Sequence, residues 1–159
     1  MTKQEQVLSE ARSWLGTPWH HMGDENAVAI KGVCVDCAVL LVEVFKAAGL
    51  VPQSLNPCPY SMDWNIHRNE EKFLGWLEQY GDEVVTPQAG DVAVWQYGRV
   101  FSHGAIVIDD AGTMVHAYRT AKMVTLGNLF EHELRYQKNG QLRPVKFFRV
   151  RGIEVGVKA

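Results

Sequence analysis

A cysteine and two histidines are the residues of this chain whose types suit covalent chemistry. Cys37 follows an aspartate, and His103 and His116 each stand in a separate run of β-branched and small residues. A thiol becomes a nucleophile when a neighbouring imidazole takes its proton, and a third polar group can hold that imidazole in the required tautomer. In that order, the three residues predict a nucleophile, a general base and an orienting residue for acyl transfer.

The helix that would position Cys37 can be recognised from its two ends. Asp36 is a natural N-cap and Gly49 a natural stop, and residues 38–48 between them are almost wholly apolar. Cys37 would then lie on the first turn of a buried helix, where free backbone N–H groups and the positive end of the helix dipole favour a thiolate. We therefore expect a lowered thiol pKa, and the same N–H groups could hold an oxyanion.

The two histidines belong to a predicted β-hairpin. Residues 103–108 and 113–118 are strand-like runs, and Asp109-Asp110-Ala111-Gly112 between them is typical of a turn. Adjacent antiparallel strands would bring His103 and His116 close together. Because a lone histidine on a strand is most often a hydrogen-bonded structural residue, the catalytic interpretation depends on the combination with Cys37.

The remaining segments predict an α+β fold. The expected elements are helices and strands at 3–14, 70–80, 92–95 and 145–150, a long ordered loop near the cleft mouth at 52–68, and a mixed segment at 122–134. We expect a single domain over residues 1–159, in which the N-terminal helices come first and the nucleophile helix packs on a small antiparallel sheet.

Five short motifs carry a resemblance to a known family. They are, in chain order, Gly16-Thr17-Pro18-Trp19, Val35-Asp36-Cys37, Gly90-Asp91-Val92, His103-Gly104-Ala105-Ile106 and Val115-His116-Ala117. Over residues 11–148 the chain resembles the NlpC-type cell-wall cysteine peptidases, and most closely their phage tail-associated branch. The resemblance implies a papain-like fold in which Cys37 is the nucleophile, His103 the base and His116 the polar residue that orients the base.

Two positions depart from the pattern of that family. Ser-Gly usually follows the cysteine, where this chain has Ala38-Val39, a change that we expect to affect packing more than chemistry. The family often has an oxyanion-site tyrosine where this chain has Trp19. The candidates for oxyanion or substrate binding are therefore Trp19, whose alternative role is plain cleft wall, with His20, His21 and Asp36.

The resemblance also implies a substrate and a location. It implies hydrolysis of a peptide bond in the peptidoglycan stem, next to D-glutamate, without a cofactor or metal, and tail proteins as further partners. The polar residues 1–6 and the amphipathic pattern of residues 7–15 predict no signal peptide, and the sequence has no transmembrane run. We therefore expect a protein made in the host cytoplasm, carried in the phage virion tail and acting on the bacterial wall.

Length, composition and charge fit one enzyme domain. At 159 residues and 47% hydrophobic content, the chain can bury a sizeable core without disulfides or a metal. A net charge of −2 and a pI of about 6.3 give no indication of a nucleic-acid partner, and the lack of a transmembrane run predicts no membrane insertion. Basic residues are concentrated in residues 135–158, which predicts a solvated face or, alternatively, contact with an anionic wall polymer or a partner protein.

Other functions remain open at this point. Cys34 and Cys37 form a C-x-x-C pair, as in thioredoxin-like redox sites or half of a zinc site. The zinc interpretation lacks a second ligand pair, and the redox interpretation leaves the two histidines without a role. Cys34 could still form a disulfide with Cys37 and inactivate the enzyme reversibly. The same Cys and His core would also suit an amidase or acyltransferase, and a tail-tip assembly component with a vestigial or processing-only site is a non-enzymatic alternative.

Overall fold

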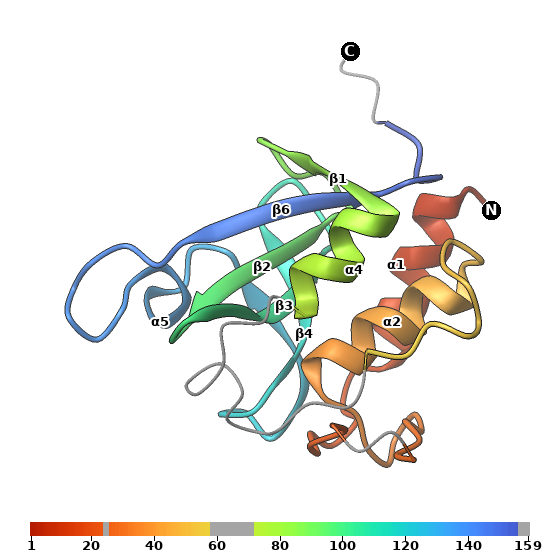
Figure 1. The fold of residues 1–159 in the computed structure, drawn as a ribbon, viewed down its shortest axis with the longest axis horizontal. Coiled ribbons are helices and arrows are strands. Elements are labelled where there is room, and N and C mark those ends of the chain that lie inside the picture. Colours follow the sequence, from red (N-terminus) through yellow and green to blue (C-terminus); the bar gives the residue numbers. More distant parts are fainter. Residues whose placement is uncertain (24–25, 58–71, 156–159) are drawn as a thin grey trace.

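The computed structural model describes residues 1–23, 26–57 and 72–155 of the chain (Figure 1). Its elements in chain order are α1 (Lys3–Ser13), α2 (Cys37–Ala47), α4 (Lys72–Tyr80), β1 (Gly81–Val84), β2 (Val92–Tyr97), β3 (Val100–Val107), β4 (Thr113–Tyr118), β5 (Met123–Asn128), α5 (His132–Arg135) and β6 (Val145–Val150). The predicted α+β architecture is confirmed. The described part of the chain contains no helix that is long and apolar enough to cross a bilayer.

The described strands form one antiparallel sheet in the order β1-β6-β2-β3-β4-β5. β3 pairs with β2 along most of its length, with Trp95 opposite His103 and a shift of register immediately after Trp95. β3 and β4, by contrast, pair only at Ile106↔Val115 and Val107↔Met114. β3 and β4 are therefore not paired at His103, although β3 is paired there with β2.

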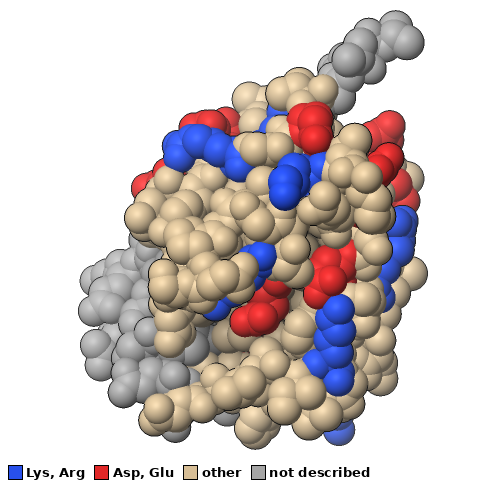
Figure 2. All heavy atoms as spheres, turned by 90° about the vertical axis from the view of Figure 1, so that its right-hand side faces the viewer, with Lys and Arg blue, Asp and Glu red and all other residues tan. Residues whose placement is uncertain are grey.

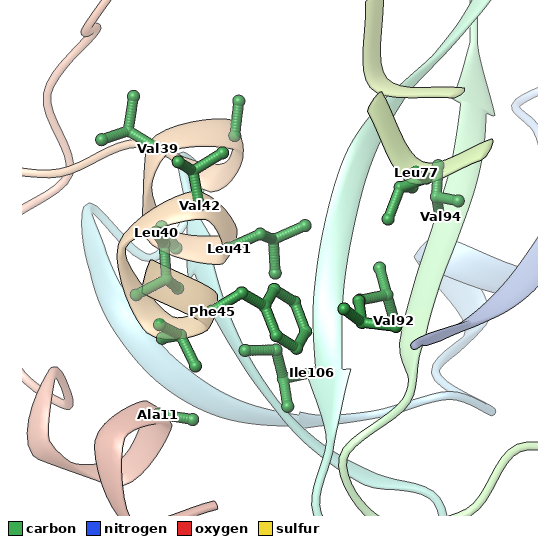
Figure 3. Packing of buried hydrophobic residues seen from close by; sticks show 14 of the residues in the cluster. Ala11, Val39, Leu40, Leu41, Val42, Phe45, Leu77, Val92, Val94 and Ile106 are labelled. Carbon is green, nitrogen blue, oxygen red and sulfur yellow. The ribbon is translucent and has the colours of Figure 1, made fainter. Parts of the chain in front are cut away.

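Helix α2 forms because its ends are capped and its length is apolar. The Asp36 carboxylate accepts the backbone N–H of Val39, and Gly49 follows the helix with a φ of +71° that suits glycine. Figure 3 shows Phe45 of α2 turned toward Ile106 and Val92 of the sheet. A fully buried side chain of this size contributes about 1.5–3 kcal/mol, so this packing helps to hold α2 on the sheet.

Helix α1 packs beside α2 and contacts the end of that helix. Thr2 and Glu5 form a capping box at its start, in which each side chain accepts a hydrogen bond from the backbone N–H of the other. The Lys3 ammonium group donates to the carbonyl oxygen of Ala48 at 2.7 Å. Figure 1 shows α1 and α2 side by side. The N-terminal helix thus contacts the C-terminal end of α2.

The two faces of the sheet carry separate apolar clusters. The larger cluster joins α1, α2 and α4 to one face, with Leu77 and Val94 among its members. The smaller cluster lies on the opposite face, where Leu134 of α5 packs with Trp95 and Met114. The segment around α5 therefore covers the sheet face that carries Trp95, the residue paired with His103.

The mixed segment predicted at residues 122–134 has regular secondary structure. It contains the edge strand β5 and the short helix α5. Only Val124 of β5 is buried, so the strand has little of the apolar alternation by which strands are recognised in a sequence. Backbone hydrogen bonds between Val124 and residues 16–17 cover part of this edge. Residues 58–68 of the predicted loop and 70–71 of the predicted helix lie outside the described residues.

Several basic residues of the C-terminal stretch make internal contacts. Arg149 binds the fully buried Asp91 through two hydrogen bonds of 2.9 and 3.0 Å, and Arg151 binds Asp82 at 3.0 Å. The first pair joins β6 to the residue before β2, and the second is an exposed pair between the residue after β6 and β1. The charge pattern predicted neither contact. On the face shown in Figure 2, acidic and basic side chains are interspersed among the described residues.

Candidate active site

Cys37 lies where α2 meets the sheet. As the first residue of α2, it points a half-buried thiol at β3, and Sγ lies 3.4 Å from the carbonyl oxygen of Ser102. The backbone N–H of Gly104 also faces the sulfur. Ser102 and Gly104 flank His103 in the chain, so the thiol is held against the backbone on both sides of the predicted base.

The protonation of Cys37 differs from the sequence-based expectation. Burial, followed by the adjacent Asp36 carboxylate, raises the pKa of the Cys37 thiol to about 12. The backbone N–H groups of Gly104, Cys37 and Ala38 act in the opposite direction, as expected for a helix N-terminus, but are outweighed. The expected lowering of the thiol pKa was therefore wrong, because the pattern shows the helix dipole but not the loss of solvation.

The two histidines meet as predicted. Nε2 of His103 lies 2.9 Å from Nδ1 of His116, although the residues stand on different strands. One of these nitrogens must donate and the other accept. If Nδ1 of His103 is to accept a proton from Cys37, the ring's own proton must lie on Nε2. The Nε2–H group of His103 then donates a hydrogen bond to Nδ1 of His116. His116 is then protonated on its outer nitrogen, Nε2.

Both imidazoles are held in their neutral form. Burial, followed by His116 and the positive charge of Arg143, lowers the pKa of His103 to about 3. Burial lowers the pKa of His116, which is only 1% exposed, to about 4. At neutral pH the free protein therefore holds the Cys37 thiol and both imidazoles in their neutral forms.

Aromatic rings surround His103, and the sequence analysis did not identify them. Trp95 stacks on His103 with a centroid separation of 5.6 Å, and Tyr97 meets it edge-on at 6.0 Å. Tyr118 lies 5.7 Å from His103 and stacks on His116 at 4.7 Å. The two-residue spacings of Trp95 with Tyr97 and of His116 with Tyr118 place each pair on one face of a strand, a signal that could have revealed them.

Asp36 has a structural task at this site. One carboxylate oxygen accepts the backbone N–H of Val39, and the other accepts that of Met22 at 2.9 Å. The buried carboxylate therefore caps α2 and anchors the preceding loop to it. A direct role of Asp36 in oxyanion or substrate binding stays a prediction.

The predicted residues Trp19, His20 and His21 lie on that loop. Trp19 is bridged to Val35, and the backbone N–H of His20 donates to the carbonyl oxygen of Val35, two residues before Cys37. His20 is exposed, whereas Trp19 and His21 are half-buried. The Arg119 guanidinium lies 5.5 Å from the centre of the Trp19 ring. The backbone pairing attaches this loop to the residues just before Cys37. A role of Trp19, His20 or His21 in oxyanion or substrate binding stays a prediction.

Cys34 lies on a turn before α2. Its Sγ is 3.4 Å from the carbonyl oxygen of Val28, and both Cys34 and Cys37 are free thiols. Among residues 1–23, 26–57 and 72–155, no three or more His, Cys, Asp or Glu side chains gather as metal ligands would.

Comparisons with known proteins identify the fold. No protein-family model and no curated protein sequence matches the chain. Solved structures do match it. NlpC1 from Trichomonas vaginalis has 12% sequence identity and a TM-score of 0.62 over 94% of this chain and 44% of its own. The peptidoglycan hydrolase RipB from Mycobacterium tuberculosis has 20% identity and a TM-score of 0.56, over 96% and 66% of the two chains.

A third match has a length similar to that of this chain. An N-acetylmuramoyl-L-alanine amidase from Bacteroides uniformis has 12% identity and a TM-score of 0.58, over 94% of this chain and 99% of its own. The chain spans only 44% and 66% of the first two structures. The P60 domain of a Mycobacterium avium antigen also matches, with a TM-score of 0.55. The fold of this chain is therefore the papain-like α+β fold of the NlpC/p60 proteins.

Proposed function

We propose that this chain is a cysteine peptidase that hydrolyses a peptide bond in the peptidoglycan stem. The observation that carries the proposal is the arrangement of Cys37, held at the start of α2 against the backbone on both sides of His103, together with the 2.9 Å contact between His103 and His116. The fold shared with a peptidoglycan hydrolase supports the choice of substrate.

The mechanism follows from the neutral resting state. As the substrate carbonyl approaches, Nδ1 of His103 takes the proton from Sγ of Cys37, and the sulfur attacks the carbonyl carbon. The backbone N–H groups of Cys37 and Ala38, which already face the sulfur, are the first candidates to stabilise the oxyanion. His103 then passes its proton to the leaving amine, and an acyl-thioester remains on Cys37.

Water completes the reaction. His103 takes a proton from a water molecule, whose oxygen attacks the thioester and releases the acid product with the regenerated thiol. Through both steps His116 accepts the hydrogen bond from Nε2 of His103 and so holds the ring in one tautomer. Because His116 carries no negative charge, its contribution would be positional rather than electrostatic.

We further propose the finer points that the sequence resemblance implies. They are cleavage next to D-glutamate, a catalytic unit that comprises residues 1–159, association with phage tail proteins, and delivery to the bacterial wall within the virion tail. The five motifs and their similarity to the tail-associated branch support these points. Co-purification of the chain with assembled tails, probed with an antibody to it, tests the proposed location.

The test of the activity is digestion of purified peptidoglycan sacculi, with the released fragments identified by mass spectrometry. We expect new stem-peptide fragments from the parent protein and none from Cys37→Ala. Cys34→Ala is the matched control, because it removes a nearby thiol and should leave the digestion unchanged. No fragments from the parent across several wall chemotypes, under reducing conditions, would instead favour a structural tail component.

An amidase is the second candidate function. The observation that favours it is the match to an N-acetylmuramoyl-L-alanine amidase over nearly the full length of both chains. The same digestion distinguishes the two reactions. An amidase would release whole stem peptides with a free N-terminal L-alanine, whereas the proposed endopeptidase would cut within the stem and leave part of it on the sugar.

A further inference from the structure

Two tyrosines flank the predicted catalytic base. Tyr97 meets His103 edge-on at 6.0 Å with an interplanar angle of 83°, and Tyr118 lies 5.7 Å from His103 on the neighbouring strand. Tyr118 also stacks on His116, at 4.7 Å and 17°. Both tyrosine rings therefore lie against His103, and the ring of Tyr118 also stacks face to face on His116.

Each tyrosine contacts a charged residue from residues 129–144, the segment between β5 and β6 that contains α5. The hydroxyl of Tyr118 donates to Oε2 of Glu133 at 2.8 Å. The Arg143 guanidinium lies over the ring of Tyr97, 3.7 Å from its centre, which is a close cation–π contact. The two rings therefore depend for their position on residues that are far from Cys37 in the sequence.

The two anchors are also joined to each other. Arg143 donates from Nη1 to the carbonyl oxygen of Gln96 at 3.0 Å, next to Tyr97 in β2, and from Nη2 to the carbonyl oxygens of Glu133 and Tyr136 at 3.4 Å. Glu133 therefore binds Tyr118 through its side chain and Arg143 through its backbone. One connected network runs from α5 through both tyrosines to the histidines.

Such a network would restrict a motion that matters for catalysis. An imidazole on a strand can turn about its side-chain torsions, and a general base works only while the correct nitrogen faces the nucleophile. The 2.9 Å bond to His116 restrains His103 at one point, but it does not fix the plane of either ring. Stacking by Tyr118 fixes the plane of His116, and edge contact by Tyr97 limits rotation of His103.

We propose that Tyr97 and Tyr118 are positioning residues that hold the His103–His116 pair in its reactive orientation, with Glu133 and Arg143 as their anchors. The catalytic part of this inference rests on the proposed function. The orientation of the histidines does not, because it can be measured in the protein without substrate. The two can therefore fail separately.

The experiment compares variants of Tyr118 by NMR of the ¹⁵N-histidine-labelled full chain and by turnover of peptidoglycan. In the parent we expect one tautomer for each histidine, protonated on Nε2. Tyr118→Leu, which loses both the stack and the hydroxyl, should give mixed tautomers and a kcat lower by about 10- to 100-fold, with KM within about twofold. Tyr118→Phe, which keeps the ring but loses the hydrogen bond to Glu133, should lie between the parent and Tyr118→Leu in both properties, as Glu133→Ala should.

Arg143→Gln tests the second anchor in the same way and should loosen His103 more than His116. Tyr136→Phe is the matched control, since Tyr136 comes from the same segment and its ring contacts Arg135 and His132 rather than His103. It should leave the tautomers and kcat unchanged. If Tyr118→Leu fails to fold, Glu133→Ala provides the same reading, because it removes the anchor without touching the rings.

The inference would be overturned if both anchors proved unnecessary. That result would be a single, parent-like tautomer for His103 and for His116 in Arg143→Gln and also in Tyr118→Leu, or in Glu133→Ala where Tyr118→Leu does not fold. This outcome does not depend on whether the protein hydrolyses peptidoglycan. Mixed tautomers in a chain whose parent form is inactive would support the positioning role and reject the proposed function. Lower kcat with unchanged tautomers would also contradict the inference, because it would place the effect of the tyrosines elsewhere.

Discussion

Nε2 of His103 lies 2.9 Å from Nδ1 of His116, and this contact sets the proton pattern of the site. It commits Nε2 of His103 to His116 and leaves Nδ1 as the nitrogen that can serve Cys37. The partner of His103 is the neutral imidazole of His116 rather than a carboxylate. His116 therefore offers no negative charge that would stabilise a protonated His103. The proposed mechanism therefore moves the thiol proton during attack and does not require a permanent ion pair.

The first prediction concerns the order in which substitutions damage activity. Cys37→Ala should abolish peptidoglycan hydrolysis, and His103→Ala should reduce kcat by about 10²- to 10⁴-fold, since it removes the general base. His116→Gln keeps a polar group near His103 and should have the mildest effect of the three. Steady-state kinetics on one soluble muropeptide checks the order, and a result in which His116→Gln is the worst variant would refute it.

The second prediction concerns the reactivity of the resting thiol. With the pKa of Cys37 raised to about 12, the thiolate fraction is small at neutral pH. Alkylation of Cys37 by iodoacetamide should therefore be slow at pH 7 and should rise about tenfold for each pH unit up to at least pH 10. Peptide mapping of the labelled protein follows the reaction, with Cys34 as the internal comparison. A fast rate that is constant above pH 6 would instead show a preformed thiolate–imidazolium pair.

The third prediction concerns stability in acid. The pKa of His116 is lowered from 6.5 to about 4 in the folded protein, and that of His103 to about 3. Below pH 6.5 the unfolded chain binds protons that the folded chain does not, so the free energy of unfolding should fall as pH falls from 6.5 to 4. The upper limit for each histidine is about 1.4 kcal/mol per pH unit.

Urea unfolding at a series of pH values measures this slope. His116→Gln should flatten it, because the substituted side chain does not titrate. The contribution of the histidines is fully present above pH 6.5, so the two proteins should show parallel pH dependence there. A parent protein whose stability is constant between pH 6.5 and 4 would contradict the assignment of buried neutral histidines.

The fourth prediction concerns a glycine behind His116. A methyl group at Gly127 would lie 2.8 Å from Nε2 of His116 and 3.2 Å from Oε1 of Glu131. Because a ring nitrogen in a buried, stacked imidazole cannot easily move, Gly127→Ala should cost about 1–3 kcal/mol of stability and displace His116. Thermal unfolding and kcat measure the two effects.

Gly75 provides the matched control for that substitution. It lies within α4, and a methyl group there would meet nothing within 4 Å. Gly75→Ala should therefore leave activity unchanged and stabilise the helix by about 0.5–1 kcal/mol. Equal effects of the two substitutions on kcat would show that His116 does not depend on Gly127.

The sequence predicts the parts of this site that depend on local rules. Asp36 and Gly49 mark the ends of α2, and the turn at residues 109–112 brings His103 and His116 onto antiparallel strands. These features follow from capping, periodicity and turn chemistry within short windows. The capped start of α2 and the contact between the two histidines could therefore be predicted from the sequence, whereas the catalytic roles of Cys37, His103 and His116 stay predictions.

The remaining parts depend on contacts between distant segments. Tyr118 bonds to Glu133, and Tyr97 lies against the Arg143 guanidinium, and neither contact leaves a pattern in a short window of the sequence. The thiol pKa depends on how fully α2 and β3 exclude water around Cys37, which the sequence does not show. Edge strand β5 was missed because its solvent-exposed side chains break the apolar alternation.

The central claim is that Cys37 forms a covalent acyl intermediate, and trapping that intermediate tests it most directly. The protein would be mixed with a purified stem peptide, quenched in acid within milliseconds to seconds, and analysed by intact mass spectrometry and peptide mapping. We predict a hydroxylamine-sensitive adduct on Cys37, with the mass of the acyl fragment, that is absent in Cys37→Ala and present in Cys34→Ala. Cleavage of the peptide by Cys37→Ala at the parent rate, with no adduct on any cysteine, would contradict the claim.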